Sequence, residues 1–231
     1  MHLIHRGIAN KQYKENLLKS FNQSFKKGYG IETDIHATKD HKFICFHDFT
    51  LNRIFKKKIS IKNMKYSQIK KISIQNKRPI PLLKDLLKAS KNKYPLFIEI
   101  KPTFSKKLLQ KLLKETSKFS KCVFISFKHE NIYNLLKIKS NTKVGLSFSS
   151  PSNIKTIIKK SNNKKINCLI LDKFFLKNKS IQDLKICIAL SIFVTGSKPF
   201  LFFDLFFSLN LPANFLKYSL LIFLGREFKN L

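Results

Sequence analysis

The sequence predicts an α/β fold organised around a parallel β-sheet. Short apolar runs alternate with segments in which apolar residues recur every three to four positions, an alternation typical of strands joined by helices. Several apolar runs, such as Leu169–Leu171, contain no polar residue, which indicates strands buried on both faces. The length of 231 residues suffices for one large α/β domain or for a (β/α)8 barrel, which begins at roughly 200 residues.

The expected strands and helices follow one another in a regular order. The predicted strands are Leu3–His5, Gly30–His36, Phe43–His47, Leu96–Lys101, Val123–Phe127, Val144–Phe148 and Cys168–Leu171. The predicted helices are Glu15–Lys26, Leu82–Ala89, Lys106–Phe119, Asn131–Lys137 and Ile154–Lys160. About six residues separate the second and third strands, which is too short for a crossover helix. These two strands are therefore expected to form a hairpin, or one of them to lie partly outside the sheet.

We divide the chain into a body, residues 1–190, and an atypical tail, residues 191–231. Within the body, residues of about 48–80 are Lys-rich and weakly patterned, and they are interpreted as an excursion from the sheet. The tail holds 9 of the 23 Phe residues but only 4 of the 46 Lys and Arg residues. Polar residues interrupt its apolar blocks, so it fits two buried amphipathic helices, an anchor at a membrane interface, or a late frameshift. The sequence leaves undecided whether the tail completes a barrel.

The net charge of +33 is typical in sign of proteins that bind nucleic acids or anionic membranes. The excess is nearly all Lys, scattered along a chain also rich in Asn, Ile and Phe, which is what drift toward AT-rich codons produces. The sequence has neither a recognition-helix pattern nor an aromatic and basic ribonucleoprotein motif, so no specific nucleic-acid partner is predicted. A polyanion-binding surface is the alternative. In either case the positive field is expected to draw anionic substrates toward a cleft.

The first residues and the cysteines bear on the cellular compartment. The chain begins without the basic region and apolar stretch of a signal peptide. Its four cysteines lack the spacing of a disulfide scaffold or a zinc site. We therefore expect a cytoplasmic protein with reduced thiols. Peripheral contact of the tail with the inner face of the membrane is the alternative.

Acidic residues are few, 13 in all, so their positions are informative. Glu32 and Asp34 lie two residues apart in a predicted strand and therefore project from the same face. Two carboxylates at this spacing suit a hard divalent cation, which prefers oxygen ligands. The alternative is that both simply pair with nearby lysines.

A third acidic residue occupies an otherwise apolar strand. Glu99 and Lys101 project from one face of the predicted strand Leu96–Lys101. A buried Glu is costly unless it is paired or bound to a metal. A further carboxylate ligand beside a phosphate-binding Lys accounts for both charges, and an internal ion pair between the two is the alternative.

Two histidines stand at predicted strand ends, where the active sites of barrels form. His5 is followed by Arg6, whose guanidinium can bind a phosphate through two hydrogen bonds, and by Gly7, which permits close backbone approach. His47 is followed by Asp48 at the end of another strand. The two imidazoles are candidates for a general acid and a general base.

These motifs follow one another in a definite order. They are His5-Arg6-Gly7, Glu15-Asn16, Glu32-Thr33-Asp34-Ile35-His36, Phe46-His47-Asp48, Ile80–Leu87, Ile98-Glu99-Ile100-Lys101 and Ser126-Phe127. Their order and spacing resemble the glycerophosphodiester phosphodiesterase family over roughly residues 2–150, with a weaker likeness to about residue 172. The family's Trp-Thr strand and its last Gly-x-Asp strand have no good counterpart, since the chain contains no Trp.

The resemblance implies a TIM-type (β/α)8 barrel, incomplete or irregular at its C-terminus, that hydrolyses glycerophosphodiesters to glycerol 3-phosphate and an alcohol. The positions that match the family's site are His5 and His47 for the catalytic pair, Glu32, Asp34 and Glu99 for the ligands of a divalent metal ion, usually Mg²⁺ or Ca²⁺, and Arg6 and Lys101 for phosphate contacts. The alternative is a catalytically impaired barrel that binds phosphorylated head groups.

Overall fold

The structure is a computed structural model that describes residues 2–193 and 221–225. Within the first range, the residues left out are Lys11, Tyr13, Lys173, Leu176, Lys177, Asp183, Lys185 and Ile186. In the described residues nine strands form one sheet: β1 (His2–His5), β2 (Gly30–Ala37), β3 (Phe43–Cys45), β4 (Leu96–Ile100), β5 (Cys122–Ser126), β6 (Val144–Phe148), β7 (Cys168–Asp172), β8 (Cys187–Phe193) and β9 (Leu221–Gly225). All except β3 pair in parallel, and β1 joins both β2 and β9, so they close into a ring. The predicted α/β barrel is confirmed.

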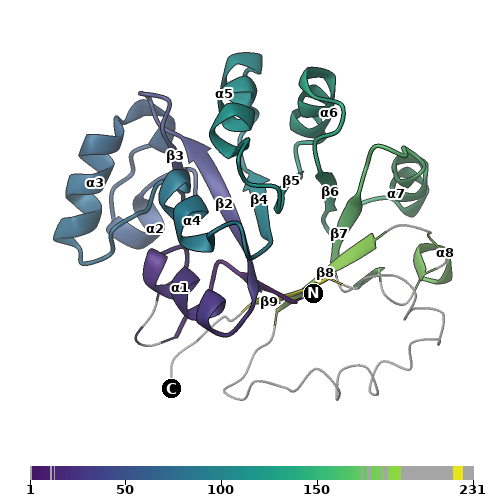
Figure 1. The fold of residues 1–231 in the computed structure, drawn as a ribbon, viewed down its shortest axis with the longest axis horizontal. Helices are drawn as coiled ribbons and strands as arrows, with labels where there is room; N and C mark the ends of the chain where they lie inside the picture. The colour runs from purple at the N-terminus through teal and green to yellow at the C-terminus, as the bar shows by residue number, and fades with distance from the viewer. Residues whose placement is uncertain are drawn as a thin grey trace.

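Helices cover the outside of this ring. They are α1 (Leu18–Lys26), α4 (Leu83–Ser90), α5 (Lys106–Thr116), α6 (His129–Ile138), α7 (Ile154–Ser161) and α8 (Lys179–Gln182). Figure 1 shows α5, α6 and α7 succeeding one another around the barrel, with α1 beside α4. Their apolar faces bury residues such as Phe21, Leu86 and Leu109 against the outer faces of the strands, because apolar spacing of three and four aligns one helix face with the sheet.

A second apolar cluster fills the barrel beneath its carboxyl end. Leu3 and Phe97 belong to this cluster, together with Ile125 of β5. Leu3 and Phe97 precede His5 and Glu99 by two residues, so each pair shares the inner face of its strand. These apolar side chains fill the interior of the barrel. The polar residues of the next layer, toward the carboxyl ends of the strands, can therefore form a site above them.

The predicted hairpin between the second and third strands is confirmed. β3 runs antiparallel to β2, with Ala37 opposite Phe43 and Ile35 opposite Cys45. Because β3 pairs only with β2 in the described sheet, it lies outside the ring of parallel strands. The hairpin delivers the chain to His47 at the mouth of the barrel.

The Lys-rich excursion is more ordered than its sequence pattern indicates. It contains α2 (Asn52–Phe55), a 3-10 helix η1 (Ile61–Asn63) and α3 (Tyr66–Gln75), with α2 and α3 beyond β3 in Figure 1. The excursion has a hydrophobic cluster of its own, made by Ile44, Phe46, Leu51, Phe55, Ile61, Met64, Ile69, Ile80 and Leu82. The pattern was weak because these residues come from short elements and meet only through tertiary packing.

This small core predicts a matched pair of effects on stability. Ile69 and Ile74 lie on the same helix α3, but Ile69 is fully buried whereas Ile74 is 52% exposed. We expect Ile69→Ala to lower the free energy of unfolding by about 2–5 kcal/mol, and Ile74→Ala to change it by less than about 0.5 kcal/mol. Urea denaturation of both variants measures this, and equal effects would contradict the packing described for α3.

The tail contributes β9 to the ring, between β8 and β1. The sequence predicted no strand at β8 or β9. The boundary placed at residue 190 falls within β8, and the division into body and tail stays a prediction. The remaining tail, 194–220 and 226–231, lies outside the described residues, as do the proposed amphipathic helices, membrane anchor and frameshift. Among the described helices, none is both long and apolar enough to cross a membrane.

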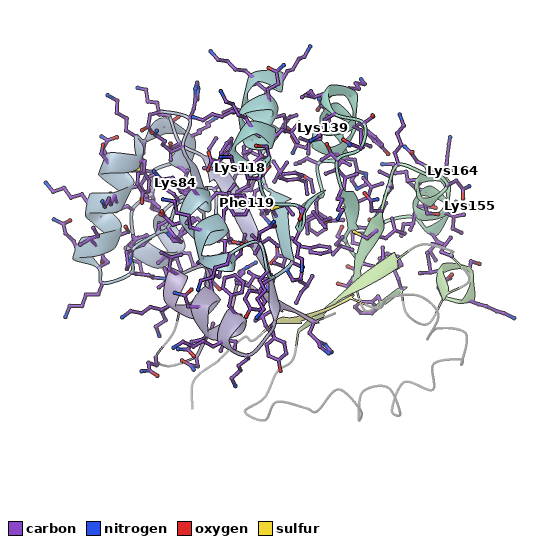
Figure 2. All side chains as sticks on the ribbon, viewed as in Figure 1. Lys84, Lys118, Phe119, Lys139, Lys155 and Lys164 are labelled. Atoms are coloured by element: carbon purple, nitrogen blue, oxygen red, sulfur yellow. The ribbon has the colours of Figure 1, made fainter. Side chains whose placement is uncertain are left out.

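The lysines are spread over the outer layer of the barrel. Figure 2 shows Lys84 on α4, Lys139 at the end of α6 and Lys155 on α7, on well-separated elements. The described part of the chain thus distributes positive charge around the barrel, in agreement with the scatter of lysines along the sequence.

Candidate active site

A pocket of about 240 Å³ opens at the carboxyl end of the barrel strands. The residues that line it are His5, Arg6, Glu32, His47, Glu99, Lys101, Ile125, Phe127, Phe148, Ser149, Ile170, Leu171 and Asp172. All the predicted site residues except Asp34 are in this lining. One side of the pocket is therefore ionic, from β1, β2 and β4, and the other is largely apolar, from β5, β6 and β7.

Three carboxylates meet beside the pocket. Glu32, Asp34 and Glu99 are all buried, and one oxygen from each lies within 4.8 Å of the others. The register explains the meeting, because Asp34 of β2 stands directly opposite Glu99 of β4. Glu32 precedes Asp34 by two residues and so shares its face.

Arg6 and Lys101 supply positive charge to the same cluster. Arg6 Nε lies 3.1 Å from Asp34 Oδ2, and Lys101 Nζ lies 3.5 Å from Asp34 Oδ1 and 2.9 Å from Glu99 Oε1. Burial raises the pKa of Asp34, but these two cations outweigh it and bring that pKa down to about 2. Asp34 is therefore ionised at neutral pH.

The pKa values of the other two carboxyl groups, Glu32 and Glu99, are raised and not lowered. Burial, and then the charges of Asp34 and Glu99, raise the pKa of Glu32 well above its usual value. Burial and the charge of Asp34 raise the pKa of Glu99 to about 7. The protein alone thus has too little positive charge here to keep all three carboxylates ionised.

The donor set fits a hard divalent cation. Among the described residues, the buried oxygens Glu32 Oε2 and Asp34 Oδ1 accept no hydrogen bond. Buried polar atoms are normally hydrogen-bonded, so two such oxygens in one cluster leave acceptor positions that suit a cation. Carboxylate oxygens are the ligands that Mg²⁺ and Ca²⁺ prefer.

Both predicted histidines reach the pocket. His5 Nε2 lies 3.7 Å from Glu32 Oε2, and burial followed by the charge of Arg6 lowers the pKa of His5 to about 4. His47 Nδ1 lies 2.7 Å from Asp48 Oδ1, and burial lowers the pKa of His47 as well. Both imidazoles are therefore neutral at pH 7 and able to accept a proton.

The backbone after β1 is bent to present Arg6. Arg6 and Asn16 both have positive φ, 56° and 54°, an uncommon conformation for residues other than Gly. The Asn16 amide N–H donates to the Arg6 carbonyl at 2.9 Å, and the Asn16 side chain donates to Asp34 Oδ2 at 3.3 Å. Gly7 is required by packing, since a Cβ there would lie 2.9 Å from Phe21 Cδ1.

His36 lies on the same strand face as Glu32 and Asp34 but contacts the loop that carries His47. Its Nε2 lies 3.1 Å from the His47 carbonyl oxygen, and His36 is outside the carboxylate cluster. Burial lowers the pKa of His36 to about 4, so the ring is neutral and acts as a hydrogen-bond donor to the loop that carries His47.

Sequence reasoning missed two groups of residues at this site. Part of the apolar wall, Phe127 and Ile170, could have been found by taking the last inward position of the predicted strands Val123–Phe127 and Cys168–Leu171. Arg53 and its partner Glu15 are 38 residues apart and joined only by tertiary structure, so spacing gave no signal for their contact.

Comparison with known proteins agrees with this site and fold. The glycerophosphoryl diester phosphodiesterase family model matches residues 5–186. A glycerophosphodiester phosphodiesterase of Caldanaerobacter subterraneus is 28% identical over 161 residues, which is 63% of this chain and 65% of that protein. The chain thus spans slightly less than two thirds of the length of this curated relative.

Two solved structures share the fold over nearly the whole chain. The glycerophosphodiester phosphodiesterase of Thermotoga maritima has a TM-score of 0.74 and 21% identity, with 96% of this chain and 93% of that chain covered. A phosphodiesterase of Oleispira antarctica, solved with the product sn-glycerol-3-phosphate, has a TM-score of 0.74 and 17% identity, with 96% and 92% covered.

Proposed function

Because the chain belongs to the glycerophosphoryl diester phosphodiesterase family, we propose that it hydrolyses glycerophosphodiesters to glycerol 3-phosphate and an alcohol. The observation that carries the proposal is the convergence, on one pocket, of three buried carboxylates, two cations and two neutral imidazoles. Metal binding, phosphate binding and proton transfer each find suitable groups there.

Charge balance supports a phosphodiester as the ligand of this pocket. Glu32, Asp34 and Glu99 would hold the divalent cation, which when bound neutralises phosphate oxygens and makes a bound hydroxyl or water more acidic. Counting that cation, the ionised carboxylates, Arg6 and Lys101 leave one positive charge in excess. A phosphodiester carries one negative charge, so it balances the site. Arg6 can orient the phosphate through two hydrogen bonds.

The histidines supply the proton transfers. Hydrolysis breaks the bond between phosphorus and the oxygen of the leaving alcohol, and transfers one proton from the nucleophile and one to the leaving oxygen. One of His5 and His47 accepts the proton of the nucleophile as a base, and the other, which must first take up a proton from solvent, gives that proton to the leaving oxygen as an acid. For His47 the reacting atom is Nε2, because Nδ1 is engaged by Asp48.

The apolar wall gives the pocket a second, less polar side. Ile125, Phe148 and Ile170 face the ionic groups across it. The carbon skeleton of the glycerol or of the leaving alcohol can pack there, while the phosphate meets Arg6 and Lys101. The product complex of the Oleispira antarctica relative motivates sn-glycerol-3-phosphate as the product to be detected.

Turnover of defined glycerophosphodiesters tests the proposal. Purified protein is incubated with glycerophosphocholine or glycerophosphoethanolamine and with Mg²⁺ or Ca²⁺, and glycerol 3-phosphate release is measured by a coupled dehydrogenase. We expect release that stops when EDTA is added and resumes with excess metal. Absence of release from every glycerophosphodiester with every divalent ion would refute the activity.

The raised carboxyl pKa values predict pH-dependent metal affinity. In the metal-free protein the pKa of Glu99 is about 7 and that of Glu32 is raised, so below pH 7 a metal ion must displace bound protons. We expect the affinity for Mg²⁺ or Ca²⁺ to fall as pH decreases from about 8 to about 6, by up to about tenfold per pH unit for each proton released. Calorimetry in two buffers of different ionisation enthalpy counts these protons, and affinity that is independent of pH would contradict the prediction.

A further inference from the structure

An ionic network outside the pocket connects the excursion with the barrel. Arg53 of α2 has its Nε 2.6 Å from Asp48 Oδ2 and its Nη2 3.1 Å from Asp48 Oδ1, a two-point contact between guanidinium and carboxylate. The same Nη2 lies 2.6 Å from Glu15 Oε1, in the connection between β1 and α1. One side chain thus fixes two carboxylates from different parts of the chain.

Each of these carboxylates in turn contacts a residue that lines the pocket. Asp48 Oδ1 lies 2.7 Å from His47 Nδ1, and Glu15 Oε2 lies 3.5 Å from Arg6 Nη1. Arg53 is absent from the pocket lining and its side chain is 50% exposed. Its influence on the pocket therefore passes through Asp48 and Glu15.

The Asp48 contact determines which nitrogen of His47 carries the proton. Burial raises the pKa of Asp48, but the hydrogen bonds from Arg53 and His47 lower it to below its usual value, so Asp48 is an ionised carboxylate. An ionised carboxylate only accepts hydrogen bonds, and an acceptor 2.7 Å from Nδ1 requires a proton on Nδ1. The lone pair of neutral His47 is then on Nε2.

We propose that Arg53 is a positioning residue for the reaction. It holds Asp48 in the orientation that keeps the Nδ1-protonated form of His47, and it holds Glu15 where Glu15 steadies Arg6. The kinetic part of this inference rests on the proposed function. The fork of a guanidinium suits the task, because it contacts both oxygens of Asp48 and still reaches Glu15.

If Arg53 served stability alone, its loss would lower the melting temperature and leave the kcat and KM of the folded enzyme unchanged. Because the Arg53 side chain is half exposed, solvent weakens the contribution of its ion pairs to stability. Loss of Arg53 is therefore expected to lower the melting temperature only slightly. A displacement of about 1 Å at a reacting group can nevertheless lower the rate by about 100-fold.

The first test compares two variants that lose one positive charge each from the excursion. Lys57 is exposed and just after α2, so Lys57→Gln is a charge-matched control for Arg53→Gln. With glycerophosphocholine and Mg²⁺, Arg53→Gln is expected to lower kcat by about 10- to 100-fold and to raise KM, with Lys57→Gln close to wild type. Arg53→Lys should recover only part of the loss, since it restores the charge without the fork. In a protein that already carries Asp48→Asn, adding Arg53→Gln should lower kcat much less than it does in the wild type.

A second test does not depend on turnover. Nitrogen NMR of ¹⁵N-histidine-labelled protein at neutral pH reports the tautomer of His47, whose signals are assigned by their loss in His47→Asn. We expect the Nδ1-protonated form in wild type and Lys57→Gln, and a shift toward a tautomer mixture in Arg53→Gln. An unchanged His47 tautomer in Arg53→Gln would overturn the inference, as would unchanged kcat and KM in an active enzyme. If wild type lacks activity, the proposed function fails, and the tautomer comparison still decides the role of Arg53.

Discussion

Replacing His5 or His47 with Ala is expected to lower kcat by about 10²–10⁴-fold, the usual contribution of a positioned proton-transfer group. The affinity for the metal ion should change little. In the described part of the chain, the cluster able to hold a metal consists of three carboxylates and includes neither imidazole. The measurement is activity against metal concentration for each variant, in which added metal should fail to restore the rate.

An exposed histidine provides the control for this experiment. His41 lies in the hairpin loop, outside the pocket lining, and has a φ of 55°, so His41→Asn is the appropriate substitution. It should retain wild-type kcat. Recovery of His5→Ala or His47→Ala at high metal concentration would mean that the imidazole is a metal ligand, and the assignment of roles would be wrong.

The sequence was most informative where chemistry and local periodicity coincide. Glu32 and Asp34 share a strand face by spacing alone, and Glu99 stands out as a charge within an apolar strand. The structure brings these residues together through the register of β2 and β4. Local pattern and a costly buried charge were sufficient to predict this part of the site.

Other features depend on contacts that local patterns do not encode. The different pKa values of the three carboxyl groups depend on Arg6 and Lys101, because Asp34 forms ion pairs with both cations, whereas Glu99 shares Lys101 with Asp34. The contact of Arg53 with Glu15 needs the excursion to fold back on the barrel. In the same way, β9 is positioned by its pairing with β8 and β1, and not by a local pattern of alternating residues followed by a turn.

The three carboxylates should also differ from one another when they are replaced. Glu99→Gln resembles the protonated form of Glu99, which burial already favours, so the stability of the metal-free protein should change little. Asp34→Asn removes the partner of two mostly buried cations, Arg6 and Lys101, and is expected to lower the free energy of unfolding by about 3–5 kcal/mol. Thermal and urea unfolding without metal distinguish the two variants.

Replacing any one of the three carboxylates should weaken metal binding, because each substitution removes one charged oxygen ligand. We expect affinity for Mg²⁺ or Ca²⁺ to fall by roughly 100-fold in Glu32→Gln and Glu99→Gln, with activity partly restored by excess metal. That recovery separates these variants from His5→Ala and His47→Ala within one titration. Wild-type metal affinity in Glu99→Gln would place the ion elsewhere and leave Glu99 as the ion-pair partner of Lys101. If Glu99→Gln loses affinity for the metal ion but keeps the stability of the metal-free protein, Glu99 serves as a metal ligand and not as a stabilising ion-pair partner. The raised pKa of Glu99 then reflects a carboxyl group that is fully ionised only when a cation is bound.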